Sequence, residues 1–163
     1  MDRLFRRRKA QRAPEPPSER IRVYARDVEI SGWVQPSGER ITDILRHGGE
    51  LAFLPDGADA SDPDSWLSLV SDSVLIVIPP PHVSPPERRL RRQTQRVRVR
   101  IAQYEVTGTA HLRPGFEQDL MLRATQPFLP LTDATLATDG RPGTQPHEVV
   151  IVNLAEVQEI TEI

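Results

Sequence analysis

The sequence predicts an all-β protein made of two tandem small five-stranded barrels, each a strongly bent antiparallel sheet. A repeat is the first observation: residues 21–32 read IRVYARDVEISG, and residues 97–108 read VRVRIAQYEVTG, 76 positions later. The second is period-two alternation, since arginines separate Val97, Val99 and Ile101, as in a half-buried strand. The third is composition: 16 prolines among 163 residues interrupt long helices and favour short strands joined by loops.

The repeat continues along the chain and indicates an internal duplication. Four residues of the first stretch recur unchanged, so that Arg22, Val23, Glu29 and Gly32 become Arg98, Val99, Glu105 and Gly108. Three later blocks follow in the same order: SGERITD and PGFEQD, AFLP (52–55) and PFLP (127–130), and SVLIVI (73–78) and EVVIVN (148–153). Because the interval changes only from 76 to 75 between the first block and the last, we interpret the chain as two copies of one unit.

The second unit carries a full set of predicted strands. The first two are 97–101 and YEVTGTAHL (104–112), whose central Gly108 indicates a bulge or a sharp bend of the sheet. After a turn, the third, fourth and fifth strands are predicted in PFLPLTDATLAT (127–138), EVVIVNL (148–154) and VQEITEI (157–163). Small antiparallel sheets of this kind remove their exposed edges by closing into a barrel.

The first unit follows the same plan at first and departs from it later. DGADASDPDS (56–65) is predicted as an acidic loop, SWLSLV (65–70) as the third strand, and VLIVI (74–78) as the strand after it. The proline-rich PPPHVSPPE (79–87) stands where the second unit has its fifth strand, and its prolines cannot sustain a ladder. We therefore expect the first unit to lack a clear fifth strand.

These elements divide the chain into four parts. Residues 1–19, basic and then proline-rich, are predicted to be a disordered tail, and residues 20–83 the first barrel unit. Residues 84–96 are predicted to be a linker rich in proline and arginine, in which ERRLRRQTQ (87–95) forms one or two helical turns. Residues 97–163 are predicted to be the second barrel unit.

Basic side chains are concentrated in two strips. The net charge is −2, yet residues 1–12 carry six basic side chains and one acid, and residues 88–100 carry seven and none. The rest of the chain keeps 8 of the 21 basic and 22 of the 23 acidic side chains. The candidate contacts to phosphate, to nucleic acid or to an anionic membrane surface are Arg6, Arg7, Arg8, Lys9, Arg88, Arg89, Arg91 and Arg92.

Two simpler interpretations of these strips stay open. In the first interpretation, the strip at residues 1–12 is a tail exposed to solvent. In the second, the strip at residues 88–100 pairs with the acidic remainder of the chain, which docks the linker on that remainder. If the first strip instead meets a membrane, Leu4 and Phe5 beside it would add shallow insertion.

The repeat also predicts residues with a structural role in both units. Gly32 and Gly108 occupy the same place in their strands, where a missing Cβ lets the sheet curl. Each of two phenylalanines stands before a Leu-Pro dipeptide and is expected to plug a barrel end. These residues are Phe53 with Pro55, and Phe128 with Pro130.

Several chemistries are absent from the sequence. There is no cysteine, which excludes disulfides, thiolate metal sites and cysteine nucleophiles. The four histidines do not stand at metal-ligand spacings, segment 56–65 lacks the register of a calcium loop, and no GxSxG, HExxH or phosphate-loop pattern occurs. We therefore expect no enzyme activity, no metal and no cofactor. The run VLIVI (74–78) is too short to cross a bilayer and no signal-peptide core is present, so a soluble cytoplasmic protein is predicted.

The order of the predicted strands, with a glycine in the second and VVIVNLAEVQEI at the end, resembles the Sm-like small β-barrel. The resemblance covers residues 21–83 and 97–163, and it extends to bacterial domains of unknown function with a G…FLPLTDA…VNxxxIxxI pattern. The family's RNA site does not carry over, because Asn153-Leu154 and Ile78-Pro79 stand where its RNA binders have an Arg/Lys-Gly dipeptide. Sm-like barrels associate edge to edge through their fourth and fifth strands, which implies that the strand edges are interaction surfaces.

A second resemblance is to PilZ domains, β-barrels that bind cyclic di-GMP. RRLRR supplies Arg88 and Arg92 at the RxxxR spacing, before the first strand of the second unit, as in those domains. The partner motif, DxSxxG, does not occur in residues 97–163.

The sequence therefore predicts a non-enzymatic binding or assembly module of two duplicated small β-barrels. Its expected partner is a second copy or another protein, bound through strand edges. Two alternatives stay open: binding of nucleic acid, RNA in particular, through the arginine-rich strips, and PilZ-like binding of cyclic di-GMP.

Overall fold

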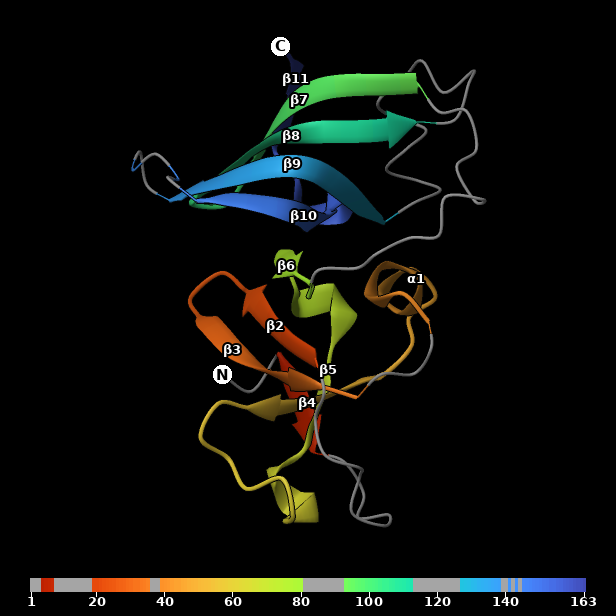
Figure 1. Cartoon of the computed structure of the whole chain (residues 1–163), viewed down its shortest axis with the longest axis vertical. Helices are drawn as coiled ribbons and strands as arrows, with labels where there is room; N and C mark the ends of the chain where they lie inside the picture. The colour runs from red at the N-terminus through yellow and green to blue at the C-terminus, as the bar shows by residue number, and fades with distance from the viewer. Residues whose placement is uncertain are drawn as a thin grey trace. The chain divides into compact units, whose positions relative to one another are not determined.

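The computed structural model describes residues 4–7, 19–35, 39–80, 93–112, 127–138, 141, 143 and 145–163, with only the backbone of Arg6 and Arg7. The chain forms two compact units, Met1–Pro80 and Pro81–Ile163 (Figure 1). The predicted all-β class is confirmed: in the described residues, strands are joined by one short helix, α1 (Ile41–Arg46), and by 3₁₀ turns. No helix in this part of the chain has the length and apolar character needed to cross a membrane.

The described strands of the second unit form one sheet. Its strands are β7 (Gln93–Ile101), β8 (Tyr104–Leu112), β9 (Phe128–Thr138), β10 (Pro146–Asn153) and β11 (Glu159–Glu162). They lie in the order β10-β9-β8-β7-β11, and neighbours are antiparallel. The five strands predicted for this unit are confirmed.

The start of β7 corrects the predicted linker. β7 begins at Gln93, so the last residues of segment 84–96 are strand and not linker or helix. The reason is its partner: β8 continues to Leu112, and β7 pairs with it along its whole length, with Gln93 opposite Leu112. Residues 81–92 lie outside the described part of the chain.

The described residues of the first unit form the helix and six strands. Five strands, β2 (Glu19–Tyr24), β3 (Glu29–Val34), β4 (Leu51–Pro55), β5 (Leu67–Leu69) and β6 (Ile76–Ile78), lie in the order β5-β4-β3-β2-β6. A sixth, β1 (Phe5–Arg7), pairs antiparallel with β5. Helix α1 connects β3 to β4 and buries an apolar face, which the sequence did not predict. That face consists of Ile41, Ile44 and Leu45.

The two units share one strand order. If the strands of each are numbered along the chain, with β1 left aside, both sheets read fourth, third, second, first, fifth. In both, a 3₁₀ turn joins the fourth strand to the fifth: η2 (Ser71–Ser73) and η4 (Leu154–Glu156). After each turn one N–H bonds to the end of the first strand, from Leu75 to the Tyr24 oxygen and from Gln158 to the Arg100 oxygen, both at 2.9 Å. The shared order and turn support the internal duplication.

The pairing corrects the alignment of the first unit. SWLSLV and VLIVI, predicted as the third and fourth strands, form β5 and β6, which are the fourth and fifth. The third strand is β4, and segment 56–65 joins it to β5. The prediction that this unit lacks a fifth strand is wrong, because β6 pairs with β2, with Val77 opposite Val23. A strand's place depends on its partners, whereas short aliphatic runs look alike wherever they occur.

The central glycine of the second strand has the same place in both units. Gly32 lies opposite Ile21, and Gly108 lies opposite Val97. At both positions a side chain would collide with the third strand. In the second unit the register between β8 and β9 also shifts on the two sides of Gly108, which is the bulge that the sequence predicts.

The predicted equivalence of the two phenylalanines is wrong. Two residues after the glycine, Val34 lies opposite Phe53 in the first unit, and Ala110 lies opposite Leu131 in the second. Phe53 therefore corresponds to Leu131 and not to Phe128. The third strands differ in length, five residues in β4 and eleven in β9, which breaks the correspondence of the sequence blocks. The same holds for Pro55 and Pro130.

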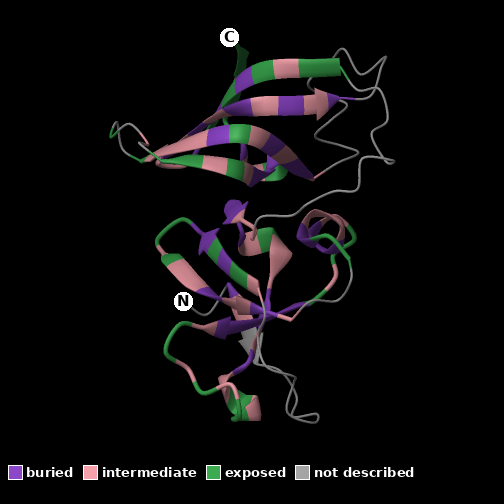
Figure 2. Cartoon of the chain, viewed as in Figure 1, coloured by how far each residue is buried: buried purple, intermediate pink, exposed green. Residues whose placement is uncertain are grey.

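Strands β7 and β8 each bury one face (Figure 2), whereas β4 and the end of β10 bury consecutive residues. In β8 every second residue from Tyr104 to Leu112 is buried. In β7 the predicted alternation is confirmed, because Val97, Val99 and Ile101 are buried between exposed arginines. Within the described residues neither sheet closes on itself: no ladder joins β5 to β6, or β10 to β11.

The N-terminal segment contradicts the predicted disordered tail at residues 4–7, and β2 already begins at Glu19. Leu4 is buried, with 3% of its surface exposed, and the Phe5 ring stacks on the Phe53 ring with centroids 5.2 Å apart. These two apolar side chains explain why a strongly basic segment pairs with β5. The insertion of Leu4 and Phe5 into a membrane would require this pairing to be given up.

Candidate functional site

The predicted polyanion contacts are placed only in part. The backbones of Arg6 and Arg7 lie in β1, opposite Ser68 and Leu67 of β5. The other six predicted contacts, Arg8, Lys9, Arg88, Arg89, Arg91 and Arg92, lie outside the described residues. The role of the two basic strips therefore stays a prediction.

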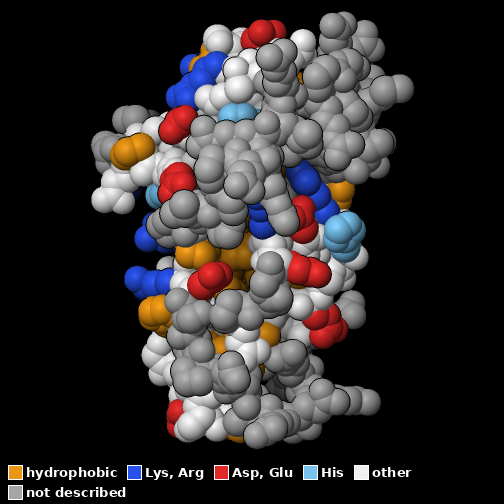
Figure 3. Space-filling model, turned by 45° about the vertical axis from the view of Figure 1, so that its right-hand side comes forward, with side chains coloured by type: hydrophobic (Ala, Val, Ile, Leu, Met, Phe, Trp, Pro, Cys, Tyr) orange, Lys and Arg blue, Asp and Glu red, His pale blue; other side chains and the backbone are white. Residues whose placement is uncertain are grey.

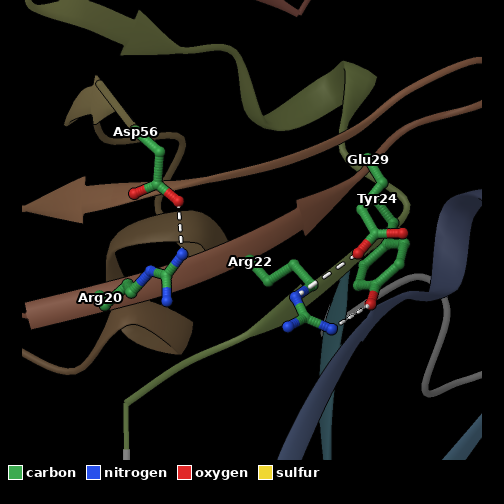
Figure 4. Close-up of polar contacts among 5 residues, drawn as sticks. All are labelled: Arg20, Arg22, Tyr24, Glu29 and Asp56. Carbon is green, nitrogen blue, oxygen red and sulfur yellow. Dashed lines mark hydrogen bonds and ion pairs between the residues drawn. The ribbon is translucent and has the colours of Figure 1, made fainter. Parts of the chain in front are cut away.

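An arginine–glutamate pair recurs in the two units. The Nε atom of Arg22 lies 3.5 Å from Oε1 of Glu29 (Figure 4), and the Nε atom of Arg98 lies 3.6 Å from Oε1 of Glu105. The signal was present in the sequence, because these four residues are the identical charged positions of the repeat. Their side chains are about half exposed, so each pair contributes little stability, about 0–1 kcal/mol.

Other arginines on the strand faces also have acidic or carbonyl partners. Arg20 binds Asp56 (Figure 4), and Arg100 of β7 lies 3.6 Å from Glu159 of β11. Arg96 donates to the carbonyl oxygen of Asp133 at 3.0 Å. On the face shown in Figure 3, basic and acidic side chains are interspersed. A polyanion that bound these strand faces would have to compete with neighbouring carboxylates for the same arginines.

Tyr24 forms a partly buried polar contact with Arg22. Its residue is 4% exposed, and its hydroxyl oxygen accepts a hydrogen bond from Nη1 of Arg22 at 3.4 Å (Figure 4). Burial raises the pKa of Tyr24 because it disfavours the phenolate, and the Arg22 guanidinium opposes this shift. The hydrogen bond to Tyr24 is also the main cause of the raised pKa of Arg22.

At alkaline pH, the wild-type protein is expected to lose stability more steeply than the Tyr24→Phe variant. The folded state holds the Tyr24 proton more tightly than the unfolded state, whose pKa is 10.0. The stability that this group contributes is complete below that value and is lost as the pH rises through the folded pKa. Urea unfolding followed by tryptophan fluorescence at about pH 8 and about pH 10.5 measures the difference. An equal loss in both proteins would contradict the assignment.

The acidic loop uses its carboxylates for its own turns. Oδ1 of Asp59 accepts hydrogen bonds from the backbone N–H and the hydroxyl of Ser61, at 2.8 and 2.7 Å, and these bonds lower the pKa of Asp59. Asp62 caps the 3₁₀ turn η1 (Pro63–Ser65). Beneath the loop, Trp66 packs with Ala52 and Leu54. Among the described residues, no three acidic or histidine side chains gather in a way that could hold a metal ion.

β11 is the last strand of its sheet and presents an open edge. It pairs with β7, with Ile160 opposite Val99, and no other described strand lies along its outer side. The N–H of Ile163 donates to the Arg96 oxygen at 3.1 Å. Because successive N–H groups of a strand point to opposite sides, the N–H of Glu162 points away from β7. Ile163 follows the strand and is 53% exposed.

The first unit shows what such an edge can accept. β5, its fourth strand, has β4 on one side and the added strand β1 on the other. Sequence patterns did not reveal this pairing, because β1 has only three residues and lies in a stretch that is mostly arginine.

No known protein family, no curated protein and no solved structure matches the chain.

Proposed function

We propose that the protein is a non-enzymatic binding or assembly module made of two duplicated, Sm-like small β-barrels, which takes up another polypeptide along its strand edges. The open edge of β11 is the observation that carries the proposal. A strand edge offers a row of unpaired N–H and C=O groups, and main-chain hydrogen bonds to an added strand satisfy them. The partner is a second copy of the chain or another protein.

Three further features support this proposal. β5 already carries an added strand, so the fold tolerates strand addition. The common strand order and the 3₁₀ turn before the fifth strand are compatible with a small barrel in each unit. Arg22, Arg98 and Arg100 on the strand faces pair with glutamates, which favours the edges over the faces as the binding surface. A cytoplasmic location belongs to the proposal and rests on the sequence alone.

The two alternatives stay predictions and gain no support from the described residues. RNA binding depends on the arginine-rich strips and PilZ-like binding of cyclic di-GMP on Arg88 and Arg92, and residues 88–92 lie outside the described part of the chain. The arginines of β7 that follow them contact Glu105, Glu159 and the Asp133 carbonyl oxygen.

The Glu162→Pro substitution is expected to abolish association through β11. Proline at this position removes the outward N–H and places its ring on the open edge, while the inward bonds to β7 remain. Glu162→Ala is the matched control, since it removes the same carboxylate but keeps the N–H. Size-exclusion chromatography with light scattering over a range of concentrations measures the mass of each protein.

We expect the wild type and Glu162→Ala to form a concentration-dependent oligomer of higher mass than Glu162→Pro, which lacks the association through β11. Self-association through β11 would be disproved if the proline variant associated like the wild type. If all three proteins stayed monomeric, self-association would be excluded, and only the part of the proposal that names another protein would remain.

A further inference from the structure

β1 is an addition to the repeated fold. The two units have the same five strands in the same order, and β1 lies outside this set, at the outer side of β5. Its three residues pair antiparallel with β5, with Phe5 opposite Leu69 and Arg7 opposite Leu67. The pairing continues one residue further, because the N–H of Val70 donates to the carbonyl oxygen of Leu4 at 2.8 Å.

Two side chains of this segment enter the core of the first unit. Leu4 is 3% exposed, and the Phe5 ring lies nearly parallel to the Phe53 ring, at an interplanar angle of 18°. Phe53 is completely buried and is also the residue whose ring covers Gly32. The edge of β5 is thus a built docking site for an extended strand, with an aromatic contact at the position of Phe5.

We propose that this site is filled by the N-terminal strand of a second copy, so that two chains exchange residues 4–7 and form a reciprocal dimer. The inference rests on the proposed assembly function and names its partner. An exchange preserves every contact that β1 makes, because the same residues meet the same site on the other chain. The exchange also fills the β5 edges of both chains. After the first N-terminal strand has docked, the docking of the second is intramolecular.

The length of the connection and the charge of the segment are compatible with this exchange. The connection from β1 to β2 comprises residues 8–18, and eleven residues can span up to about 40 Å when extended, so the connection does not tie β1 to its own chain. A ladder of three residues is short and opens more readily than the longer strands of the sheets. The exchanged segment is basic, whereas most of the remaining chain is acidic, so the body of a second copy attracts it as the body of its own chain does.

Single cysteines can detect this exchange without background, because the chain has none of its own. Arg7 and Leu67 are direct partners in the ladder. Leu4 and Val70 form a hydrogen-bonded pair, and such pairs alternate along an antiparallel ladder, so Arg7 and Leu67 form a non-hydrogen-bonded pair. Their Cα atoms are then about 4.5 Å apart, which is within reach of a disulfide. Leu67 is only partly buried, so cysteine is tolerated there.

The experiment mixes two separately purified full-length chains, Arg7→Cys and Leu67→Cys, under mild oxidation. We expect a disulfide-linked heterodimer in several-fold excess over a control mixture of Arg7→Cys with Ser61→Cys, whose cysteine lies on the exposed acidic loop. Adding Phe5→Ala to the Arg7→Cys chain should lower the yield about tenfold, because the aromatic contact is lost. In a double variant, Arg7→Cys with Leu67→Cys, the disulfide should join two chains.

The proposal is overturned if the double variant forms only a disulfide within one chain while the mixture yields no more heterodimer than its control. This failure is distinct from failure of the assembly function. If the crosslink fails but wild-type chains associate and Glu162→Pro chains do not, assembly occurs through β11 without exchange. If the crosslink forms equally well in chains that carry Glu162→Pro, the exchange is established independently of the β11 edge.

Discussion

Replacing Gly32 with alanine is expected to lower the free energy of unfolding of the first unit by about 2–4 kcal/mol. A Cβ atom on Gly32 would overlap both the Phe53 ring and the carbonyl oxygen of Leu54. Neither neighbour can move freely, because Phe53 is completely buried and the Leu54 oxygen belongs to the backbone of the paired strand β4. The substitution must therefore push β3 and β4 apart.

Tryptophan fluorescence during urea unfolding measures this effect, because both tryptophans, Trp33 and Trp66, lie in the first unit. The matched control is Ser31→Ala, one residue earlier in β3 and partly exposed, which should change stability by no more than about 0.5 kcal/mol. If Gly32→Ala unfolded at the same urea concentration as Ser31→Ala, the close approach of the two strands would be wrong.

The duplication of the first two strands was predictable from the sequence. Gly32 and Gly108 mark equivalent places because a close contact with the third strand excludes a side chain in both units. The Arg22–Glu29 and Arg98–Glu105 pairs also recur at the interval of the repeat. Local rules sufficed for these strands, since they are adjacent in sequence and alternate clearly between apolar and charged residues.

The second half of the first unit was not predictable in the same way. β5 and β6 have three residues each, and period-two alternation cannot be recognised over so short a run. Similar letters in VLIVI and EVVIVN suggested an alignment that the pairing contradicts, because β6 is a fifth strand and β10 a fourth. The correct correspondence lies in the backbone: after each 3₁₀ turn a buried valine, Val74 or Val157, leads into the fifth strand.

The candidate sites were predictable only where they depend on charge. The composition pointed to the arginines, but most of the predicted contacts lie outside the described residues. The docking of β1 on β5 joins residues sixty or more positions apart, and the segment's basic composition is typical of disorder. Leu4 and Phe5 distinguish this segment from a disordered basic tail. Phe5 stabilises the docking by stacking on the buried Phe53, a partner that no local sequence pattern identifies.

Replacing Phe53 with alanine is expected to destabilise the first unit by about 3–5 kcal/mol, the usual cost of removing a buried phenylalanine side chain. Phe53 is 0% exposed, pairs with Val34 across the sheet and stacks on Phe5. Its loss therefore leaves a cavity beside Gly32 and also removes the contact that holds β1. We expect the alanine variant to unfold at lower urea concentration, as followed by tryptophan fluorescence.

The matched control is Phe53→Leu, because the corresponding residue of the second unit is Leu131. Leucine keeps most of the apolar volume and is accommodated at this place in a closely related sheet, so we expect a loss of about 1 kcal/mol. The difference between the two variants measures the cavity and not the aromatic ring. If Phe53→Ala and Phe53→Leu lowered stability equally, the ring rather than its volume would support the strands, and the correspondence of Phe53 with Leu131 would lose its physical basis.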